Sequence, residues 1–134
     1  MNFISGITST ASALNAEKIR MDIVSQNIAN AHTTRDVDGE AYKRKTVSFE
    51  SALDASTGQV GVRVTEIGQD KTPGETYHDP GHPHADKDGM VHLPNVNMAN
   101  EMVDLMSASR AYEANLAVAR NARQLATKSL SIGR

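Results

Sequence analysis

The sequence predicts an α+β fold in which long N- and C-terminal α-helices pair as an antiparallel coiled coil, with a small β-rich insert between them. Apolar residues recur at heptad spacing near both ends of the chain. The middle contains all four prolines, most of the glycines and short stretches in which apolar and polar residues alternate. We therefore expect residues 1–30 and 97–134 to form one discontinuous helical domain and residues 31–96 to form the insert.

Residues 3–30 are expected to form the first helix, because a stripe of apolar residues runs through about four heptads without a proline. Lys18 and Ser25 interrupt the stripe. At its end, Asn27 and Asn30 share a face, where they can bond the last carbonyls of the helix or the backbone of a neighbouring chain; we favour the first. The main line of the stripe consists of Ile7, Leu14, Met21 and Ile28, with Ile4, Ala11 and Val24 beside it.

Three strands are expected in the insert. Residues 45–51 place Val47 and Phe49 on one face, residues 58–68 alternate valine with small or polar residues, and residues 90–93 form a shorter candidate. We expect the insert to project from the far end of the helical pair. Turns between these segments are indicated by Asp38-Gly39, Pro73-Gly74, Pro80-Gly81 and Asp88-Gly89.

Residues 97–132 are expected to form the second helix. Pro94 ends the preceding strand, Asn97 can cap the helix, and Glu101 lies near the N-terminus, where the helix dipole favours an acid. Many alanines widen the small-residue surface of this helix. Met98, Leu105, Tyr112, Ala119 and Ala126 form one heptad line, and Met102, Ser109, Leu116 and Leu130 form an adjoining line.

These apolar stripes are broader than two paired helices can cover. The chain has no Trp and only two Phe, so a large self-contained core is not expected. Burying one leucine contributes roughly 1.5–3 kcal/mol, and a leftover stripe of several such residues favours assembly with further chains. The alternative is an ordinary helical hairpin that carries a β subdomain.

Composition excludes several classes of function. The net charge is -2 and the basic residues are dispersed, so we expect no nucleic-acid partner. The chain has no cysteine, which excludes disulfides and thiolate metal sites. No stretch approaches the ~20 apolar residues that span a bilayer, so direct membrane insertion is not expected. The N-terminus does not read as a cleaved signal peptide, so any export is expected to use another route.

The stretch HDPGHPHAD at residues 78–86 contains the candidate metal ligands. His82 and His84 alternate and aspartates flank them, a ligand set that zinc accepts. Pro83 between the two histidines indicates a loop, in which no helix or strand fixes the ligand geometry. We therefore expect no metal and no cofactor, and a metal-binding protein or enzyme built on this loop is the alternative. Neither GxSxG nor a phosphate-binding glycine motif occurs, so no catalytic residue is assigned.

The stretch SQNIANAHT at residues 25–33 resembles the N-terminal signature of bacterial flagellar axial proteins. DGEAYKRKTVSFES, and the run from PGHPHADKDGMVHLPNVN through EMVDLMSASRAYEAN, narrow the resemblance to the FlgC family of proximal rod subunits. It extends over essentially the whole chain. In that family the pattern Gly-His-Pro-x-Ala-Asp-x-x-Gly resembles a structural loop of a non-enzymatic protein. His84 falls at its variable position, and His78 and Met90 depart from the aromatic residues expected beside it.

The resemblance implies a structural subunit of the flagellar basal-body proximal rod, the periplasmic drive shaft that transmits torque. Implied partners are other rod subunits, further copies of the chain, the junction with the MS-ring and the flagellar type III export apparatus. The terminal helices would be disordered in the free subunit and fold on assembly. A generic coiled-coil adaptor is a further alternative. The expected assembly interface pairs Ile7, Leu14, Met21 and Ile28 with Met102, Leu105, Tyr112 and Leu116, while Asn27 and Asn30 fix the junction between helix and insert.

Overall fold

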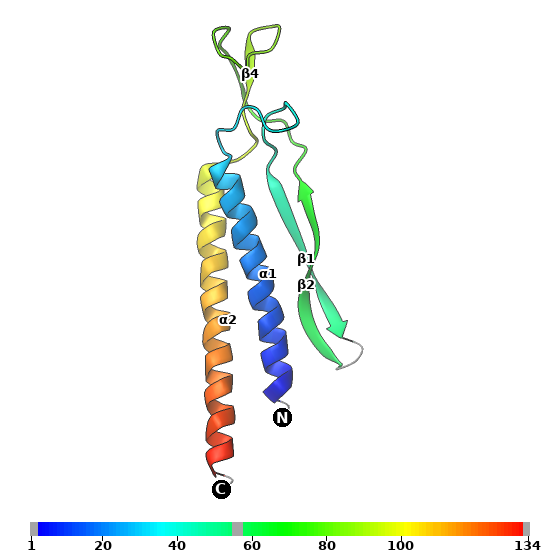
Figure 1. The fold of residues 1–134 in the computed structure, drawn as a ribbon, viewed down its shortest axis with the longest axis vertical. Helices are drawn as coiled ribbons and strands as arrows, with labels where there is room; N and C mark the ends of the chain where they lie inside the picture. Colours follow the sequence, from blue (N-terminus) through cyan, green and yellow to red (C-terminus); the bar gives the residue numbers. More distant parts are fainter. Residues whose placement is uncertain (1–2, 55–57, 133–134) are drawn as a thin grey trace.

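The computed structural model describes residues 3–54 and 58–132 and shows an elongated molecule (Figure 1). The two long helices lie side by side and run in opposite directions, so that the two ends of the chain lie toward the same end of the molecule (Figure 1). The predicted α+β class, with terminal helices and small antiparallel sheets between them, is confirmed. The elements are α1 (Phe3–Ala29), β1 (Lys45–Asp54), β2 (Gln59–Gln69), β3 (Thr76–His78), β4 (Met90–His92) and α2 (Met98–Ile132).

The hairpin of β1 and β2 folds back along α1 (Figure 1). Its strands pair antiparallel from Lys45–Gln69 to Asp54–Gln59, and Thr65 is an extra residue at an irregularity in the register. The expectation that the whole insert projects beyond the helices is therefore wrong for this half of it. The reason is that α1 has a second side, not covered by α2, against which the hairpin packs.

Helix α1 is the middle layer of the molecule. It packs against α2 on one side and against the hairpin on the other, whereas α2 packs against none of the described strands. Ser12 connects α1 to β2, because its Oγ accepts the backbone N–H of Val62 at 3.0 Å and donates to the carbonyl of Ser9 at 2.7 Å. The order of layers is thus hairpin, α1, α2.

The buried surface of α1 does not follow one heptad line. The predicted line is half-buried from Leu14 to Ile28 and exposed at Ile7. Since α1 packs on two sides, a single stripe cannot describe what it buries. Among residues 6–29 of α1, the buried ones are Thr10, Ala16, Ile23, Val24 and Asn27.

Helix α2 begins with the expected cap. The backbone N–H of Asn100 donates to Oδ1 of Asn97 at 3.1 Å, and the N–H of Glu101 donates to the Asn97 carbonyl at 3.0 Å. The predicted line from Met98 to Ala126 is half-buried throughout. In the adjoining line, Ser109 and Leu116 are half-buried, whereas Met102 and Leu130 are exposed. Among residues 98–131 of α2, the fully buried ones are Glu101 and Ala108.

A short second sheet forms the tip of the insert and projects beyond the helices (Figure 1). Strands β3 and β4 pair antiparallel from Thr76–His92 to His78–Met90. The sequence indicated β4 but not β3, because a three-residue strand leaves too short an alternation to recognise. The base of this tip is closed by the N–H of Leu93, which donates to the carbonyl of Glu75 at 2.8 Å.

Gly74 is required at the base of the tip, since a Cβ there would overlap the carbonyl oxygen of Leu93. We expect Gly74→Ala to displace this backbone and to cost on the order of 1–3 kcal/mol, as forced overpacking does. Hydrogen exchange at the Leu93 amide measures the effect as loss of protection. Gly81→Ala is the control, because its Cβ would make only an ordinary contact, 3.5 Å from Asp79 Oδ1. Equal protection in both variants would contradict the prediction.

Candidate functional site at the junction of the helices and the insert

The side chain of Asn27 lies fully buried where α1, the start of β1 and α2 meet. Its Nδ2 donates to the carbonyl of Lys45 at 2.9 Å and to Oε2 of Glu101 at 3.0 Å. Its Oδ1 accepts the N–H of Lys45 at 2.8 Å and the hydroxyl of Tyr42 at 2.9 Å. An amide side chain has two N–H donors and two acceptor lone pairs, so all its capacity is used. Asn27 therefore bonds the backbone of its own insert and has no free group for a neighbouring chain.

Glu101 is the charged member of this junction, and its side chain is also fully buried. Its Oε1 accepts a hydrogen bond from Nε of Arg44, while its Oε2 accepts one from the side-chain amide of Asn27. Arg44 also places Nη2 3.6 Å from Oδ2 of Asp104, and Arg20 approaches Oδ1 of the same carboxylate at 3.6 Å. A buried carboxylate without a cation would cost several kcal/mol, so Arg44 is what permits Glu101 at this depth.

Asn95 connects the loop before α2 to the same junction. Its Oδ1 accepts the N–H of Arg44 at 2.7 Å, and its Nδ2 donates to the carbonyls of Asp70 and Thr72 at 3.0 and 2.8 Å. The N–H of Asp70 in turn donates to the Arg44 carbonyl at 2.8 Å. Segments on both sides of the long hairpin are thereby fixed to the start of α2.

Tyr42 supplies the aromatic wall of the junction and is itself buried. Burial raises the pKa of its hydroxyl above the ordinary value, and the nearby Asp36 and Glu101 raise it further. The hydroxyl therefore stays protonated at neutral pH and remains a donor to Asn27. Sequence reasoning missed Tyr42, Arg44 and Asn95, because their partners lie far away in the sequence.

Asn30 closes the end of α1. Its Nδ2 donates to the carbonyl of Gln26 at 2.9 Å, and its Oδ1 accepts the hydroxyl of Thr33 at 3.1 Å. The carbonyl of Gln26 also receives the Asn30 backbone N–H at 3.1 Å, so this last turn is closed twice. The two asparagines thus have different roles. Asn30 forms a hydrogen bond with the end of its own helix, whereas Asn27 forms hydrogen bonds with the insert.

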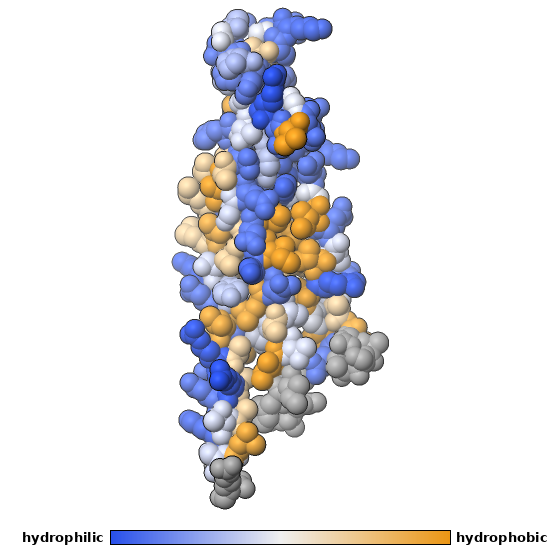
Figure 2. Space-filling view, in the orientation of Figure 1, coloured by the Kyte–Doolittle hydropathy of each residue, from blue (hydrophilic) through white to orange (hydrophobic). Residues whose placement is uncertain are grey.

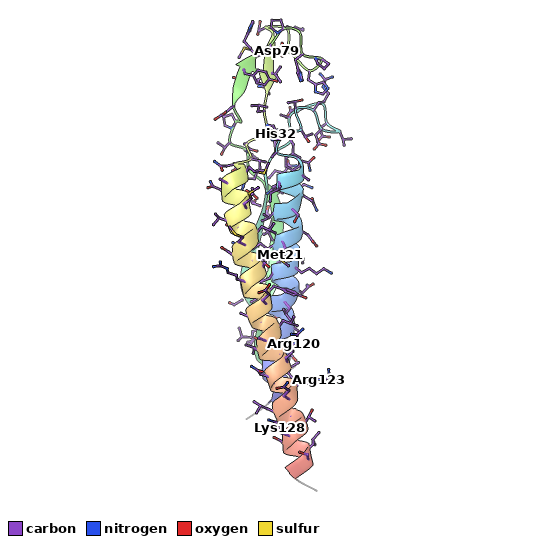
Figure 3. The ribbon with its side chains drawn as sticks, turned by 90° about the vertical axis from the view of Figure 1, so that its left-hand side faces the viewer. Met21, His32, Asp79, Arg120, Arg123 and Lys128 are labelled. Atoms are coloured by element: carbon purple, nitrogen blue, oxygen red, sulfur yellow. The ribbon has the colours of Figure 1, made fainter. Side chains whose placement is uncertain are left out.

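The other residues expected at the assembly interface lie along both helices. Two contacts set their antiparallel register, because Asn27 meets Glu101 and Arg20 approaches Asp104. Met21, in the middle of α1, lies in the region where the two helices run side by side (Figure 3). The half-buried members of the set are Leu14, Met21, Ile28, Leu105, Tyr112 and Leu116, and the exposed members are Ile7 and Met102.

The histidine loop at the tip is held by a hydrogen bond within the loop and by another to Thr34, at the base of the insert. Nδ1 of His84 pairs with the hydroxyl of Thr34 at 2.8 Å, and the His84 N–H donates to Nδ1 of His82 at 3.1 Å. The His82 ring packs edge-on against Tyr77, with ring centroids 6.5 Å apart. Within residues 3–54 and 58–132, no group of three His, Asp or Glu side chains is arranged to hold a metal ion.

Asp86 organises the second half of this loop. Its Oδ1 accepts the backbone N–H groups of Asp88 and Met90, both at 2.9 Å, and its Oδ2 lies 3.2 Å from Nε2 of His92. The N–H of Met90 above all, then His92 and the N–H of Asp88, lower the pKa of the Asp86 carboxyl below its ordinary value. Gly89 completes the turn with a φ of 72°, a conformation that favours glycine.

This lowered pKa predicts how the loop responds to acid. A group with a lowered folded pKa contributes stability above its unfolded pKa, and loses it as the pH falls through the folded value. We expect the amides of Asp88 and Met90 to lose protection from hydrogen exchange as the pH falls below the ordinary aspartate pKa of 3.8. An Asp86→Asn variant should lack this pH step. Protection that falls equally in both proteins would show that Asp86 does not control the loop.

Two family models match the helical ends of the chain. Residues 7–35 match the model described as flagella basal body rod protein, and residues 87–132 match the one described as flagellar basal body rod FlgEFG protein C-terminal. The FlgC protein of Agrobacterium fabrum is 44% identical and covers 90% of this chain and 88% of its own length. The FlgC protein of Borreliella burgdorferi is 40% identical, with 98% of each chain covered.

The chain belongs to the FlgC family of flagellar basal-body rod proteins. A FlgC protein of Bacillus subtilis is 38% identical and covers 93% of this chain and 94% of its own. The FlgC family is one of structural rod proteins, not enzymes. Asn27 lies in the first matched region and Glu101 in the second, so their hydrogen bond joins the two. Among the described residues, neither helix is both long and apolar enough for a membrane span.

Proposed function

We propose that the chain is a structural subunit of the proximal rod, built with other rod subunits and further copies of itself into the periplasmic shaft that transmits torque. The observation that carries this proposal is its surface of 9392 Å². A compact protein of 14.4 kDa would expose about 6,800 Å². The difference of roughly 2,600 Å² exceeds the ~800 Å² that one partner contributes to a standard interface. A subunit whose sides are covered by several neighbours fits this surface.

We also propose that α1 and α2 pair as an antiparallel coiled coil within one discontinuous helical domain, residues 1–30 with 97–134. The half-buried line from Met98 to Ala126, at heptad spacing, supports this pairing. The polar junction around Asn27 is then the boundary with the insert of residues 31–96. The exposed Ile7 and Met102 are available to neighbouring subunits.

The remaining partners are proposed from the family. They are the basal-body junction with the MS-ring and the flagellar type III export apparatus, with passage to the periplasm that needs no cleaved signal peptide. Terminal helices that fold only on assembly suit such a route, because an unfolded chain passes through a narrow export channel. The helices would then fold in the rod, where neighbouring subunits would cover their apolar surface. This proposal predicts that protease trims the ends of the free chain first and leaves the junction and insert longest.

Deleting the gene tests the proposal most directly. We expect loss of swimming, with basal bodies that have inner rings but neither rod nor hook in electron micrographs. Cells that swim with complete rods would refute the proposal. A metal-dependent role would instead predict a defect when His82 and His84 are replaced by alanine, with loss of bound metal. A generic adaptor would predict intact rods.

Leu116→Asp is expected to block rod assembly, because it places a charge in the half-buried seam of α2. The effect should be measured as the number of complete basal bodies per cell in a deletion strain that carries the variant gene. Ser107→Asp is the matched control, since Ser107 is exposed on the same helix. Normal swimming of the Leu116→Asp strain would remove this residue from the interface.

A further inference from the structure

Two side chains of α1 bond the backbone edges of the long hairpin. Oδ1 of Asn27 accepts the N–H of Lys45 at 2.8 Å, and its Nδ2 donates to the Lys45 carbonyl at 2.9 Å. Oγ of Ser12 accepts the N–H of Val62 at 3.0 Å. A backbone group that bonds α1 in this way points away from the other strand of the hairpin. Asn27 therefore holds the outer edge of β1 and Ser12 holds the outer edge of β2, which agrees with the crossing of the two strands in Figure 1.

The two contacts have the same spacing along the helix and along the hairpin. From Ser12 to Asn27, α1 rises about 22 Å at ~1.5 Å per residue. From Lys45 to Ser51, which lies opposite Val62, β1 extends about 20 Å at ~3.4 Å per residue. Both contacts can therefore form at once. Because they act on different strands, together they also fix the rotation of the hairpin about its own axis.

Gly61 permits the close approach of β2 to Ser12. A Cβ at Gly61 would lie 2.8 Å from Oγ of Ser12 and 3.4 Å from its Cβ. The first distance is too short for a side-chain carbon, whereas the second is an ordinary van der Waals contact. The Ser12 hydroxyl is held in place, because it donates to the carbonyl of Ser9 at 2.7 Å as well as accepting the N–H of Val62. Any larger residue at position 61 would thus push the hairpin away from α1.

The end of the hairpin turns its larger apolar side chains away from α1. Successive residues of a strand point to opposite faces, so Val60 and Val62 lie on the face opposite to Gly61. Val60 is 58% exposed, and its cross-strand partner Leu53 is 67% exposed. Apolar side chains gather over the hairpin and the adjoining part of α1 (Figure 2). Since burial of apolar surface drives folding, a hairpin free to rotate would turn this valine face, Leu53 with Val60 and Val62, toward the helix.

We propose that Ser12 and Gly61 are positioning residues, which together with Asn27 hold the valine face away from α1, and that rod assembly depends on this orientation. The inference rests on the proposed function and concerns the shape that the subunit brings to the rod. Ser12 and Gly61 act through the hairpin. Held by Asn27 alone, the hairpin could rotate, and its valines would then cover the helix of their own chain.

Cysteine labelling tests the orientation, because the natural chain has no cysteine. Val60→Cys reports on the valine face, and Ala52→Cys reports on the face of Gly61, its cross-strand partner. In the purified chain we expect a maleimide to label the Val60→Cys variant several times faster than the Ala52→Cys variant. Adding Gly61→Ala should bring the two rates together, because the new Cβ lifts the hairpin from α1. Adding Ser12→Ala as well should restore most of the difference, because it removes the oxygen that the Cβ meets.

Two controls accompany the labelling. Gly6→Ala in α1 should leave both rates unchanged, since a Cβ there would meet nothing within 4 Å. Hydrogen exchange at the Lys45 amide should be equal in all variants, which shows that the junction around Asn27 stays folded. Equal rates at the two positions before any further substitution would overturn the proposal. So would a difference that survives Gly61→Ala, or one that Ser12→Ala fails to restore.

Rod assembly gives the second readout. In a deletion strain, the gene with Gly61→Ala should yield several-fold fewer complete basal bodies, and the gene with both Gly61→Ala and Ser12→Ala should recover most of them. Normal rod numbers with Gly61→Ala, despite changed labelling, would overturn the dependence of assembly on this orientation and leave the rod function intact. Failure of the rod function itself would be seen differently, as a deletion strain that still swims.

Discussion

Replacing Asn27 by leucine is expected to detach the insert from the helices and to abolish rod assembly. The substitution removes four hydrogen bonds at a fully buried position. It leaves the backbone of Lys45, the hydroxyl of Tyr42 and one oxygen of Glu101 without their partner. Each unsatisfied buried group costs about 1–3 kcal/mol, so the four groups together cost on the order of 4–12 kcal/mol. That loss is comparable with the whole stability of a small domain.

Two measurements check this expectation. In the purified chain, hydrogen exchange at the Lys45 amide should lose the protection that Asn27 Oδ1 provides. In a deletion strain, the variant gene should fail to restore swimming at normal protein levels. Asn15→Leu is the matched control, because Asn15 is exposed on the same helix and should tolerate the same change. If the two variants behave alike, Asn27 does not control the junction.

The sequence predicted the elements of this fold better than their contacts. Both helix boundaries agree to within a residue of 3–30 and 97–132, because heptad spacing and the Asn97 cap are local signals. The side of α1 that packs against the hairpin could not be predicted, because it depends on contacts such as that of Ser12 with Val62, fifty residues away. Heptad periodicity in the sequence indicates that a helix has an apolar side, but it does not indicate how many other elements pack against that helix.

Glu101 shows the same limit at the candidate site. An acid in the first turn of a helix is ordinarily explained by the helix dipole, and the sequence alone predicts no other role for Glu101. Its burial depends on Arg44, which precedes it by 57 residues. Asn27 was indicated from the sequence as a junction residue, whereas Tyr42 and Asn95 gave no signal. Periodicity in the sequence therefore cannot predict hydrogen bonds between polar residues that lie far apart in the chain.

Removing the guanidinium of Arg44 should be nearly as damaging as the Asn27 substitution. Arg44→Met keeps most of the side-chain length but leaves the buried carboxylate of Glu101 without a cation. Breaking a buried pair in this way costs about 3–5 kcal/mol. We expect loss of rods in the variant strain and lower protection of the Arg44 amide, which donates to Asn95.

A double-mutant cycle distinguishes an unpaired charge from lost packing. Glu101→Gln removes the charge yet keeps an oxygen that can accept the Asn27 amide. Combined with Arg44→Met, it should therefore restore part of the stability and more rods than Arg44→Met alone. The exposed pair of Arg63 and Glu50 is the control, and Arg63→Met should cost no more than ~1 kcal/mol. Additive losses in the double variant would mean that Arg44 acts through packing, and its role as the counter-charge of Glu101 would have to be abandoned.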